Sequence, residues 1–249
     1  MIYVCIPAHN EERTIGVLLW KIRRVMREFG RDYVVRIHDD ASTDGTAEVL
    51  GRYAQILPVR VERSQERLGY AGALESLIRG VAYESAYPKR DVVVTLQGDF
   101  TEGPEHIVPL AKAIEGGSDL VAGEATSIGE RPRSVRFSSW AAPILLGRTL
   151  KSAPVPDPLC GMRAYRVIVL RKALRDRDRP LIRKRGWAAN IELLKELAPH
   201  ARRLSHVPVE VRYDLRQRAS RHRPWETLRA LAGLRAVRWT EQEAERTAS

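Results

Sequence analysis

Acidic side chains stand at the ends of three apolar segments of this chain. The junctions are Pro7–Glu12 after Ile2–Ile6, Asp39-Asp40 after Tyr33–His38, and Gln97-Gly98-Asp99 after Val92–Leu96. A carboxylate that follows a buried strand can hold a divalent cation against a phosphate. It can also accept hydrogen bonds from a nucleobase or a ribose hydroxyl. The residue types therefore predict a site for a phosphorylated nucleotide.

Each junction taken alone has a simpler explanation. Asp40 or Ser42 could cap the helix that follows, and Asp99 could be an ordinary turn residue. Two adjacent carboxylates repel each other, so the pair Asp39-Asp40 is not what a purely structural turn would select. The three junctions together are more specific for a ligand than any one of them.

Three common phosphate-binding motifs are absent from the sequence. A dinucleotide-binding turn needs glycines after the first strand, and Pro7–Glu12 contains none. No Gly-x-x-x-x-Gly-Lys-Ser/Thr loop occurs either, and the glycine-rich basic loop expected of a nucleotidyltransferase is missing. The phosphates must then be held by a metal ion at Asp99 and by arginine side chains.

Predicted strands and helices alternate along the chain. The predicted strands are Ile2–Ile6, Tyr33–His38, Val59–Glu62, Val92–Leu96, Asp119–Gly123, Met162–Tyr165 and 207–211. The predicted helices run from a cap at Asn10 to Phe29, from a cap at Ser42 or Thr43 to Tyr53, and over Gly69–Tyr83, Pro104–Ile114, Ala188–Leu197 and Trp225–Trp239. This order predicts a single α/β domain with a mixed, mostly parallel sheet and helices on both faces. Parallel strands end at one edge of a sheet, so the three junctions should converge there.

The positive charge is concentrated in the last third of the chain. The 249 residues carry a net charge of +11, and from Arg163 onwards 22 basic residues stand against 10 acidic ones. This asymmetry indicates an anionic partner such as phosphate groups, a membrane surface or nucleic acid, or else an arginine-rich surface that only faces water. Two cysteines, no basic leader and no long apolar segment predict a reduced cytoplasmic protein that does not span a membrane.

The junction motifs resemble those of family 2 glycosyltransferases of the GT-A (Rossmann-like) fold. The segments that carry the resemblance are Ile6–Glu12, Asp39–Thr46, Arg67–Leu74, Asp157–Arg166 and His206–Val211. The segment Asp157–Arg166 is similar to that of the branch holding dolichol- and polyprenyl-phosphate sugar synthases. The resemblance implies a GT-A domain over residues 1–215, followed by a basic lid, an amphipathic helix and a tail over residues 216–249.

The resemblance also implies a role for each matching residue. The nucleotide would be held by Pro7, Glu11, Asp39 and Asp40, and the donor diphosphate by Arg67, Gln97, Gly98 and Asp99. Asp99 would bind Mg²⁺ or Mn²⁺, and Asp157 would act as the general base. The acceptor or its phosphate would contact Arg163, Ser220 and Arg221. Apart from the resemblance, Arg131 could hold an acceptor phosphate or lie in a loop that only faces water.

Two positions depart from the family's pattern. Gln97 stands where the family has the first aspartate of Asp-x-Asp, and Thr101 stands where the lipid-phosphate branch has a glutamine. An amide oxygen can coordinate a cation but carries no charge, so we expect weaker metal binding. Glu102 would compensate if the turn brings it inward.

These observations predict an inverting glycosyltransferase that moves a sugar from a UDP- or GDP-sugar to a polyprenyl phosphate. A soluble hydroxyl compound, such as a natural-product intermediate, is the alternative acceptor, and only a hydroxyl would need Asp157 to take its proton. The alternative from another class is a basic nucleic-acid-binding protein, although an acidic site would repel a polyphosphate strand. We expect the enzyme in the cytoplasm, with peripheral contact to the anionic inner face of the membrane.

Overall fold

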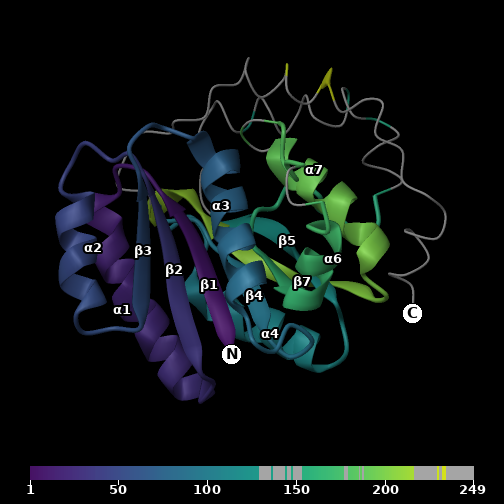
Figure 1. Ribbon diagram of the computed structural model, residues 1–249, viewed down its shortest axis with the longest axis horizontal. Helices are drawn as coiled ribbons and strands as arrows, with labels where there is room; N and C mark the ends of the chain where they lie inside the picture. The colour runs from purple at the N-terminus through teal and green to yellow at the C-terminus, as the bar shows by residue number, and fades with distance from the viewer. Residues whose placement is uncertain are drawn as a thin grey trace.

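Seven strands form one sheet in the part of the chain that the structure describes (Figure 1). The structure is a computed structural model, and it describes residues 1–128, 153–176, 179–184, 186 and 188–215, with isolated positions at 136, 144, 147, 229, 232 and 233. The strands are β1 Ile2–Ala8, β2 Tyr33–Asp40, β3 Val59–Ser64, β4 Val92–Thr95, β5 Leu120–Ile128, β6 Arg163–Arg166 and β7 Leu204–Arg212. The seven predicted strands are confirmed, with ends shifted by a few residues.

The strand order is β3-β2-β1-β4-β6-β5-β7. β1 pairs in parallel with β2 and β4, β2 with β3, and β5 with β7, whereas β6 runs antiparallel between β4 and β5. The prediction of a mixed, mostly parallel sheet is therefore confirmed. Because β6 runs against its neighbours, its first residue, Arg163, pairs with Thr95 at the end of β4. The segment before β6 thus reaches the edge where β4 ends.

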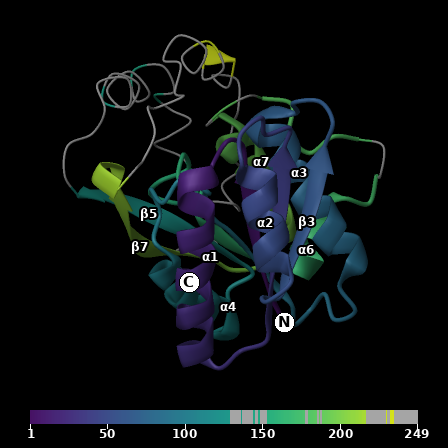
Figure 2. The same cartoon turned by 90° about the vertical axis from the view of Figure 1, so that its left-hand side faces the viewer.

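Helices cover both faces of the sheet, as predicted (Figure 2). The described helices are α1 Glu12–Phe29, α2 Thr46–Ala54, α3 Gly69–Glu84, α4 Ile107–Glu115, α6 Val167–Ala173 and α7 Ala188–Leu197, with 3-10 turns at η1 Pro104–His106, η2 Ala198–His200 and η3 Tyr213–Leu215. Helices α1, α2 and α4 pack on one face, and α3, α6 and α7 pack on the other.

Each face of the sheet has its own core. Val4 and Ile6 of β1 pack with α1, whereas Tyr3 and Cys5 of the same strand pack with α3. Successive side chains of a strand point to opposite faces, so a strand covered on both sides favours apolar residues at every position. This burial explains why Ile2–Ile6 is a continuous apolar run rather than an alternating one.

Two helix starts differ from the prediction. Asn10 does not cap α1; it has a φ of +50°, and its side-chain oxygen accepts the backbone N–H of Thr43 at 2.7 Å. Glu11 is the N-terminal cap residue instead. Helix α2 begins after Gly45 because Ser42 and Thr43 bond the loop that leaves β1. The polar side chains predicted as caps therefore join the exits of β1 and β2.

The predicted C-terminal helix lies outside the described residues. The segment Trp225–Trp239, and the predicted lid and tail over 216–249, are described only at positions 229, 232 and 233. Within the part of the chain that the structure does describe, no helix is long and apolar enough to cross a bilayer.

Candidate active site

The ends of β1, β2 and β4 lie side by side at one edge of the sheet (Figure 1). Ala8 of β1 pairs with Asp39 of β2, and Cys5 of β1 pairs with Thr95 of β4. The turn after β4 therefore begins next to the loop that leaves β1. The predicted convergence of the three junctions is confirmed.

One threonine joins two of these junctions. Thr14 Oγ1, in the first turn of α1, lies 3.1 Å from Glu11 Oε2 and 3.0 Å from the carbonyl oxygen of Gly98. A Cβ built on Gly98 would lie 3.5 Å from Glu11 Cγ and 3.6 Å from the carbonyl oxygen of Pro7. The structure therefore brings Pro7, Glu11 and Gly98 together.

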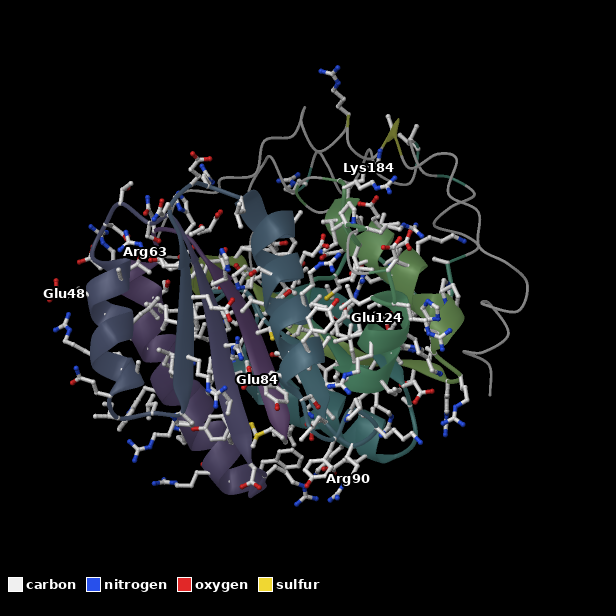
Figure 3. The ribbon with its side chains drawn as sticks, viewed as in Figure 1. Glu48, Arg63, Glu84, Arg90, Glu124 and Lys184 are labelled. Atoms are coloured by element: carbon white, nitrogen blue, oxygen red, sulfur yellow. The ribbon has the colours of Figure 1, made fainter. Side chains whose placement is uncertain are left out.

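Asp39 is fully buried at the end of β2. Its Oδ1 accepts the backbone N–H of Ser42 at 3.1 Å, and its Oδ2 lies 3.4 Å from Nε of Arg63. Arg63 comes from the end of β3 (Figure 3). Its side chain is 54% exposed. The sequence reasoning missed Arg63, although its place at the end of a parallel strand put it on this edge.

Both carboxylate oxygens of Asp40 hold the start of α3. Oδ1 accepts the backbone N–H of Leu68 at 2.6 Å, and Oδ2 accepts that of Gly69 at 2.9 Å. The first N–H groups of a helix have no partner inside the helix, and an anion there is stabilised. Gly69 has a φ of +75°, which glycine adopts without strain. Each carboxylate oxygen has a second lone pair, so Asp40 can still accept a hydrogen bond from a ligand.

Two guanidinium groups border this part of the edge. Arg67 Nε lies 4.0 Å from Asp40 Oδ2, and 60% of the Arg67 side chain is exposed. A pocket of about 480 Å³ at the ends of β2 and β3 is lined by Ala41, Ser42, Thr43, Arg63, Ser64 and Gln65. The exposed guanidinium groups of Arg63 and Arg67 can therefore form charge-assisted hydrogen bonds with a phosphate.

Asp99 is buried in the turn after β4, with 1% of the residue exposed. Its Oδ1 accepts the backbone N–H of Thr101 at 3.1 Å and the hydroxyl of the same residue at 2.5 Å. Phe100, between them, has a φ of +66°, which is uncommon for a residue with a side chain. Thr101, at the position of the family's glutamine, thus orients the Asp99 carboxylate.

Glu102 is turned inward in the same turn and is 2% exposed. Its Oε2 accepts the backbone N–H of Gln97 at 3.2 Å, and its Oε1 accepts the side-chain amide of Gln97 at 3.4 Å. Burial, together with the nearby charge of Asp99, raises the pKa of Glu102 to about 7. The turn therefore brings Glu102 inward, and its compensation for the missing charge at position 97 stays a prediction.

The oxygen atoms of this turn suit a hard divalent cation. Asp99 and Glu102 offer carboxylates, and Gln97 offers an amide oxygen, because its NH₂ group is used by Glu102. Among the described residues no group of three or more His, Cys, Asp or Glu side chains is arranged to hold a metal ion. Mg²⁺ is usually bound by one or two carboxylates, and substrate phosphates and water complete its coordination. The residues fit a cation that binds together with its phosphate.

Asp157 and Arg163 hold the loop that precedes β6. Asp157 Oδ1 accepts the backbone N–H groups of Leu159 and Cys160 at 3.0 and 3.1 Å, and its Oδ2 accepts that of Ala125 at 3.4 Å. Arg163 is 1% exposed and donates to the carbonyl oxygens of Pro158 and Asn190. A contact between Arg163 and a phosphate stays a prediction. Arg163 would have to give up these two hydrogen bonds in order to bind the phosphate.

Three predicted acceptor residues lie outside the described residues. They are Arg131, Ser220 and Arg221. The structure therefore brings together Pro7, Glu11, Gly98, Asp99 and Gln97 at one edge, with Asp39, Asp40 and Arg67 beside them.

The curated relatives of this chain have the names of sugar transferases. Residues 3–174 match the family described as Glycosyl transferase family 2. The dolichyl-phosphate hexose transferase of Haloferax volcanii is 32% identical over 218 residues, covering 87% of this chain and 83% of the relative. The undecaprenyl-phosphate 4-deoxy-4-formamido-L-arabinose transferase of Pseudomonas paraeruginosa is 28% identical over 187 residues, covering 72% of this chain. The chain spans about half the length of that relative, 51%.

Solved structures have the same architecture. Glucosyl-3-phosphoglycerate synthase from Mycobacterium tuberculosis, in complex with Mn²⁺, UDP-glucose and phosphoglyceric acid, is 25% identical with a TM-score of 0.64, over 94% of this chain and 77% of that one. S. aureus TarS in complex with UDP-GlcNAc is 17% identical with a TM-score of 0.59, over 89% of this chain and 60% of that one, and shows the fold alone. With its described sheet, its family match and its relatives, this chain belongs to glycosyl transferase family 2 and has the GT-A fold.

Proposed function

We propose that this chain is an inverting glycosyltransferase that moves a sugar from a UDP- or GDP-linked donor to a polyprenyl phosphate. The observation that carries the proposal is the position of Thr14, whose hydroxyl lies within hydrogen-bond distance of both Glu11 and Gly98. It joins the junction expected to hold the nucleoside to the turn expected to hold the diphosphate. A nucleotide-sugar needs both parts of the site at once.

The nucleoside would lie between the ends of β1 and β2. Pro7 and Glu11 come from β1 and its exit, and Asp40 comes from β2 with hydrogen-bond capacity left over. Asp39 would act less directly, because its carboxylate already accepts from Ser42 and pairs with Arg63. The exposed guanidinium group of Arg67 would bind the diphosphate.

The leaving group accumulates negative charge as the sugar departs, and stabilising that charge is the main task of the site. Asp99, oriented by Thr101, would hold Mg²⁺ or Mn²⁺, with Gln97 and Glu102 beside it. A divalent cation there would supply positive charge to the departing diphosphate. The Mn²⁺ and UDP-glucose bound to the M. tuberculosis neighbour support this choice of cofactor and donor.

A polyprenyl phosphate acceptor fits the names of the curated relatives. Its phosphate is ionised near neutral pH, so it can attack the anomeric carbon without a general base. Asp157 accepts hydrogen bonds from three backbone N–H groups, which supports a role for this residue in holding the loop. Arg131, Arg163, Ser220 and Arg221 remain the residues proposed for the acceptor phosphate. Such an enzyme would work from the cytoplasm as a peripheral protein at the inner face of the membrane.

A soluble acceptor is the second candidate. The M. tuberculosis neighbour, which is similar over 94% of this chain, was crystallised with phosphoglyceric acid. A hydroxyl acceptor would need a base, and Asp157 would take its proton. Oδ2 would be the accepting atom, because its bond to Ala125 is the longest of the three, at 3.4 Å.

Calorimetric titration with UDP and with GDP, each in the presence and absence of Mn²⁺, tests the proposal. We expect binding of one nucleoside diphosphate that strengthens with Mn²⁺. Failure of both to bind would remove the glycosyltransferase proposal. Sugar transfer to a short-chain polyprenyl phosphate, compared with transfer to phosphoglycerate, would then identify the class of acceptor.

A further inference from the structure

The outer side of α1 presents one continuous stripe of basic and apolar side chains. Arg13, Val17, Trp20, Arg24 and Arg27 are all exposed and follow one another at intervals of four, three, four and three residues. This spacing places them in a single line along a helix. The opposite side of α1 carries the buried positions Ile15, Leu18, Leu19, Ile22 and Met26. The stripe therefore faces away from the sheet.

The stripe and its flanks are positively charged. Helix α1 contains Arg13, Lys21, Arg23, Arg24 and Arg27 against Glu12 and Glu28. Glu28 lies 3.6 Å from Arg24, but both side chains are largely exposed, so the pair neutralises the face only weakly. Glu12 is turned aside, because its carboxylate accepts the backbone N–H of Gly45. An anionic surface would complement this face.

Two apolar side chains stand in the middle of these charges. Val17 is 56% exposed and Trp20 is 53% exposed. The guanidinium group of Arg23 lies 4.7 Å from the centroid of the Trp20 ring. Tryptophan flanked by arginine and lysine is the composition of helices that lie in the interface between a bilayer and water.

The stripe ends in a pocket that is also lined by arginines. Arg23, Arg27 and Arg31 line a cavity of about 490 Å³ at the C-terminal end of α1, together with Asp32 and Tyr33. Arg31 pairs with Glu115, whereas neither Arg23 nor Arg27 forms a salt bridge or a side-chain hydrogen bond within the described residues. Arginine side chains in such a hollow can bind a phosphate group of a lipid head.

We propose that the outer face of α1 docks on an anionic lipid bilayer. The proposal rests on the polyprenyl phosphate acceptor inferred above, because an acceptor anchored in lipid has to be reached from the membrane surface. Helix α1 is 18 residues long, or about 27 Å, and begins directly after Glu11 at the active-site edge. A bilayer lying along α1 would therefore meet the active site at the rim of the contact (Figure 2).

Vesicle flotation of the full chain tests the docking face. The probes are phosphatidylcholine vesicles and vesicles that also contain phosphatidylglycerol, at low ionic strength. We expect binding only to the anionic vesicles, and a loss of at least about tenfold in partitioning for the double variant Arg24→Glu/Arg27→Glu, because charges near the surface attract anionic lipid. The matched control is Arg175→Glu/Arg183→Glu, which changes the net charge equally on the other face of the sheet, where both side chains are exposed. The control should keep its binding.

Several results would overturn the docking face. One such result is a wild-type protein that does not bind anionic vesicles. Another is an equal loss of vesicle binding in both double variants, because binding would then depend on the net charge of the protein and not on α1. A third result is that the wild type does not bind vesicles while the α1 double variant changes its oligomeric mass. The outer face of α1 would then be an interface between copies of the protein. Quenching of tryptophan fluorescence by brominated lipid should fall in Trp20→Phe, and unchanged quenching would also contradict the proposal.

The nucleotide titration keeps this test separate from the proposed function. Both double variants should bind UDP or GDP as the wild type does, because neither touches the active-site edge. If the nucleotide binds and vesicles do not, the glycosyltransferase stands and the docking face is wrong. If no nucleotide binds to the wild type, the glycosyltransferase proposal fails whatever the vesicles show, and the docking face loses the acceptor on which it rests.

Discussion

The carboxylate of Glu102 accepts hydrogen bonds from both the backbone N–H and the side-chain amide of Gln97, at 3.2 and 3.4 Å. The turn after β4 thus carries its second buried carboxylate at position 102, whereas the family's pattern has a carboxylate at position 97. Gln97 serves as the hydrogen-bond donor that keeps Glu102 in place. The uncharged residue that departs from the pattern is therefore hydrogen-bonded to a buried carboxyl group of the same turn.

The stability of the protein should depend on the titration of Glu102. Burial raises its pKa from 4.5 to about 7, so near pH 6 the folded protein keeps a proton that the unfolded chain has released. The stabilisation is complete below about pH 4.5 and is lost as the pH rises through about 7. Glu102→Gln should flatten the dependence of unfolding free energy on pH by up to about 3 kcal/mol, measured by urea denaturation. The exposed Glu66, changed to Gln, is the control, and an unaltered pH profile in Glu102→Gln would contradict the assignment.

A second carboxylate at position 97 should strengthen metal binding. Gln97→Asp adds a charge beside Asp99, and we expect the affinity for Mn²⁺ in the presence of UDP to rise about tenfold, measured by electron paramagnetic resonance. The variant also loses the amide donor to Glu102, so it should unfold at a lower temperature above neutral pH. Gln55→Asp, at the end of α2, is the control. Equal Mn²⁺ affinity in Gln97→Asp and the wild type would mean that position 97 does not reach the cation.

Loss of the Asp99 charge should abolish turnover. Asp99→Asn keeps an oxygen to accept the two bonds from Thr101, so the turn should stay folded. We expect sugar transfer to fall by at least about a hundredfold, because charge stabilisation at the leaving group is lost. The Mn²⁺-dependent part of UDP binding should disappear with it. Asp32→Asn, exposed at the opposite edge of the sheet, should leave both unchanged. Undiminished transfer in Asp99→Asn would refute the mechanism.

Substitutions of Asp40 and Arg67 should have different effects, the first on the stability of the fold and the second on ligand binding. Asp40→Ala removes two charge-assisted hydrogen bonds at the start of α3 and should cost about 2–4 kcal/mol of stability in chemical denaturation. Arg67→Ala removes a largely exposed side chain, so it should leave the melting temperature unchanged while weakening UDP binding about tenfold. Full stability in Asp40→Ala would show that the helix start does not depend on this carboxylate.

Two glycines make a matched pair for the packing behind the site. A Cβ on Gly123 of β5 would lie 2.8 Å from the carbonyl oxygen of Met162 and 2.9 Å from Cys160 Sγ, so Gly123→Ala should cost about 1–3 kcal/mol. A Cβ on Gly51 of α2 would meet nothing within 4 Å, so Gly51→Ala should stabilise the protein by about 0.5–1 kcal/mol through helix propensity. Thermal unfolding of both variants checks the contrast, and a shift in the same direction for the two would contradict it.

The sheet could be predicted from the sequence because its strands are buried on both faces. Runs such as Val92–Leu96 have no charged position, and their alternation with amphipathic helices leaves few other folds. The direction of β6 could not be predicted in this way. Its four residues carry no pattern of their own, and only the pairing of Arg163 with Thr95 reveals that it runs against its neighbours.

Residue types at the site could be predicted better than their contacts. Glu11, Asp40 and Asp99 were expected at one edge because parallel strands end there, and they do lie at that edge. The hydrogen bonds of Asp40 to α3 and the complete burial of Arg163 depend on segments far away in the sequence. No local pattern contains that information.

The place of β6 in the sheet has a consequence for synthesis on the ribosome. One edge of β4 and one edge of β5 have no partner until β6 follows them, because β6 pairs with both. An unpaired strand edge can associate with another chain, so the nascent protein is open to aggregation during this interval. Chains released before β6 should therefore need a chaperone, and the second edge of β5 stays unpaired until β7 has followed as well.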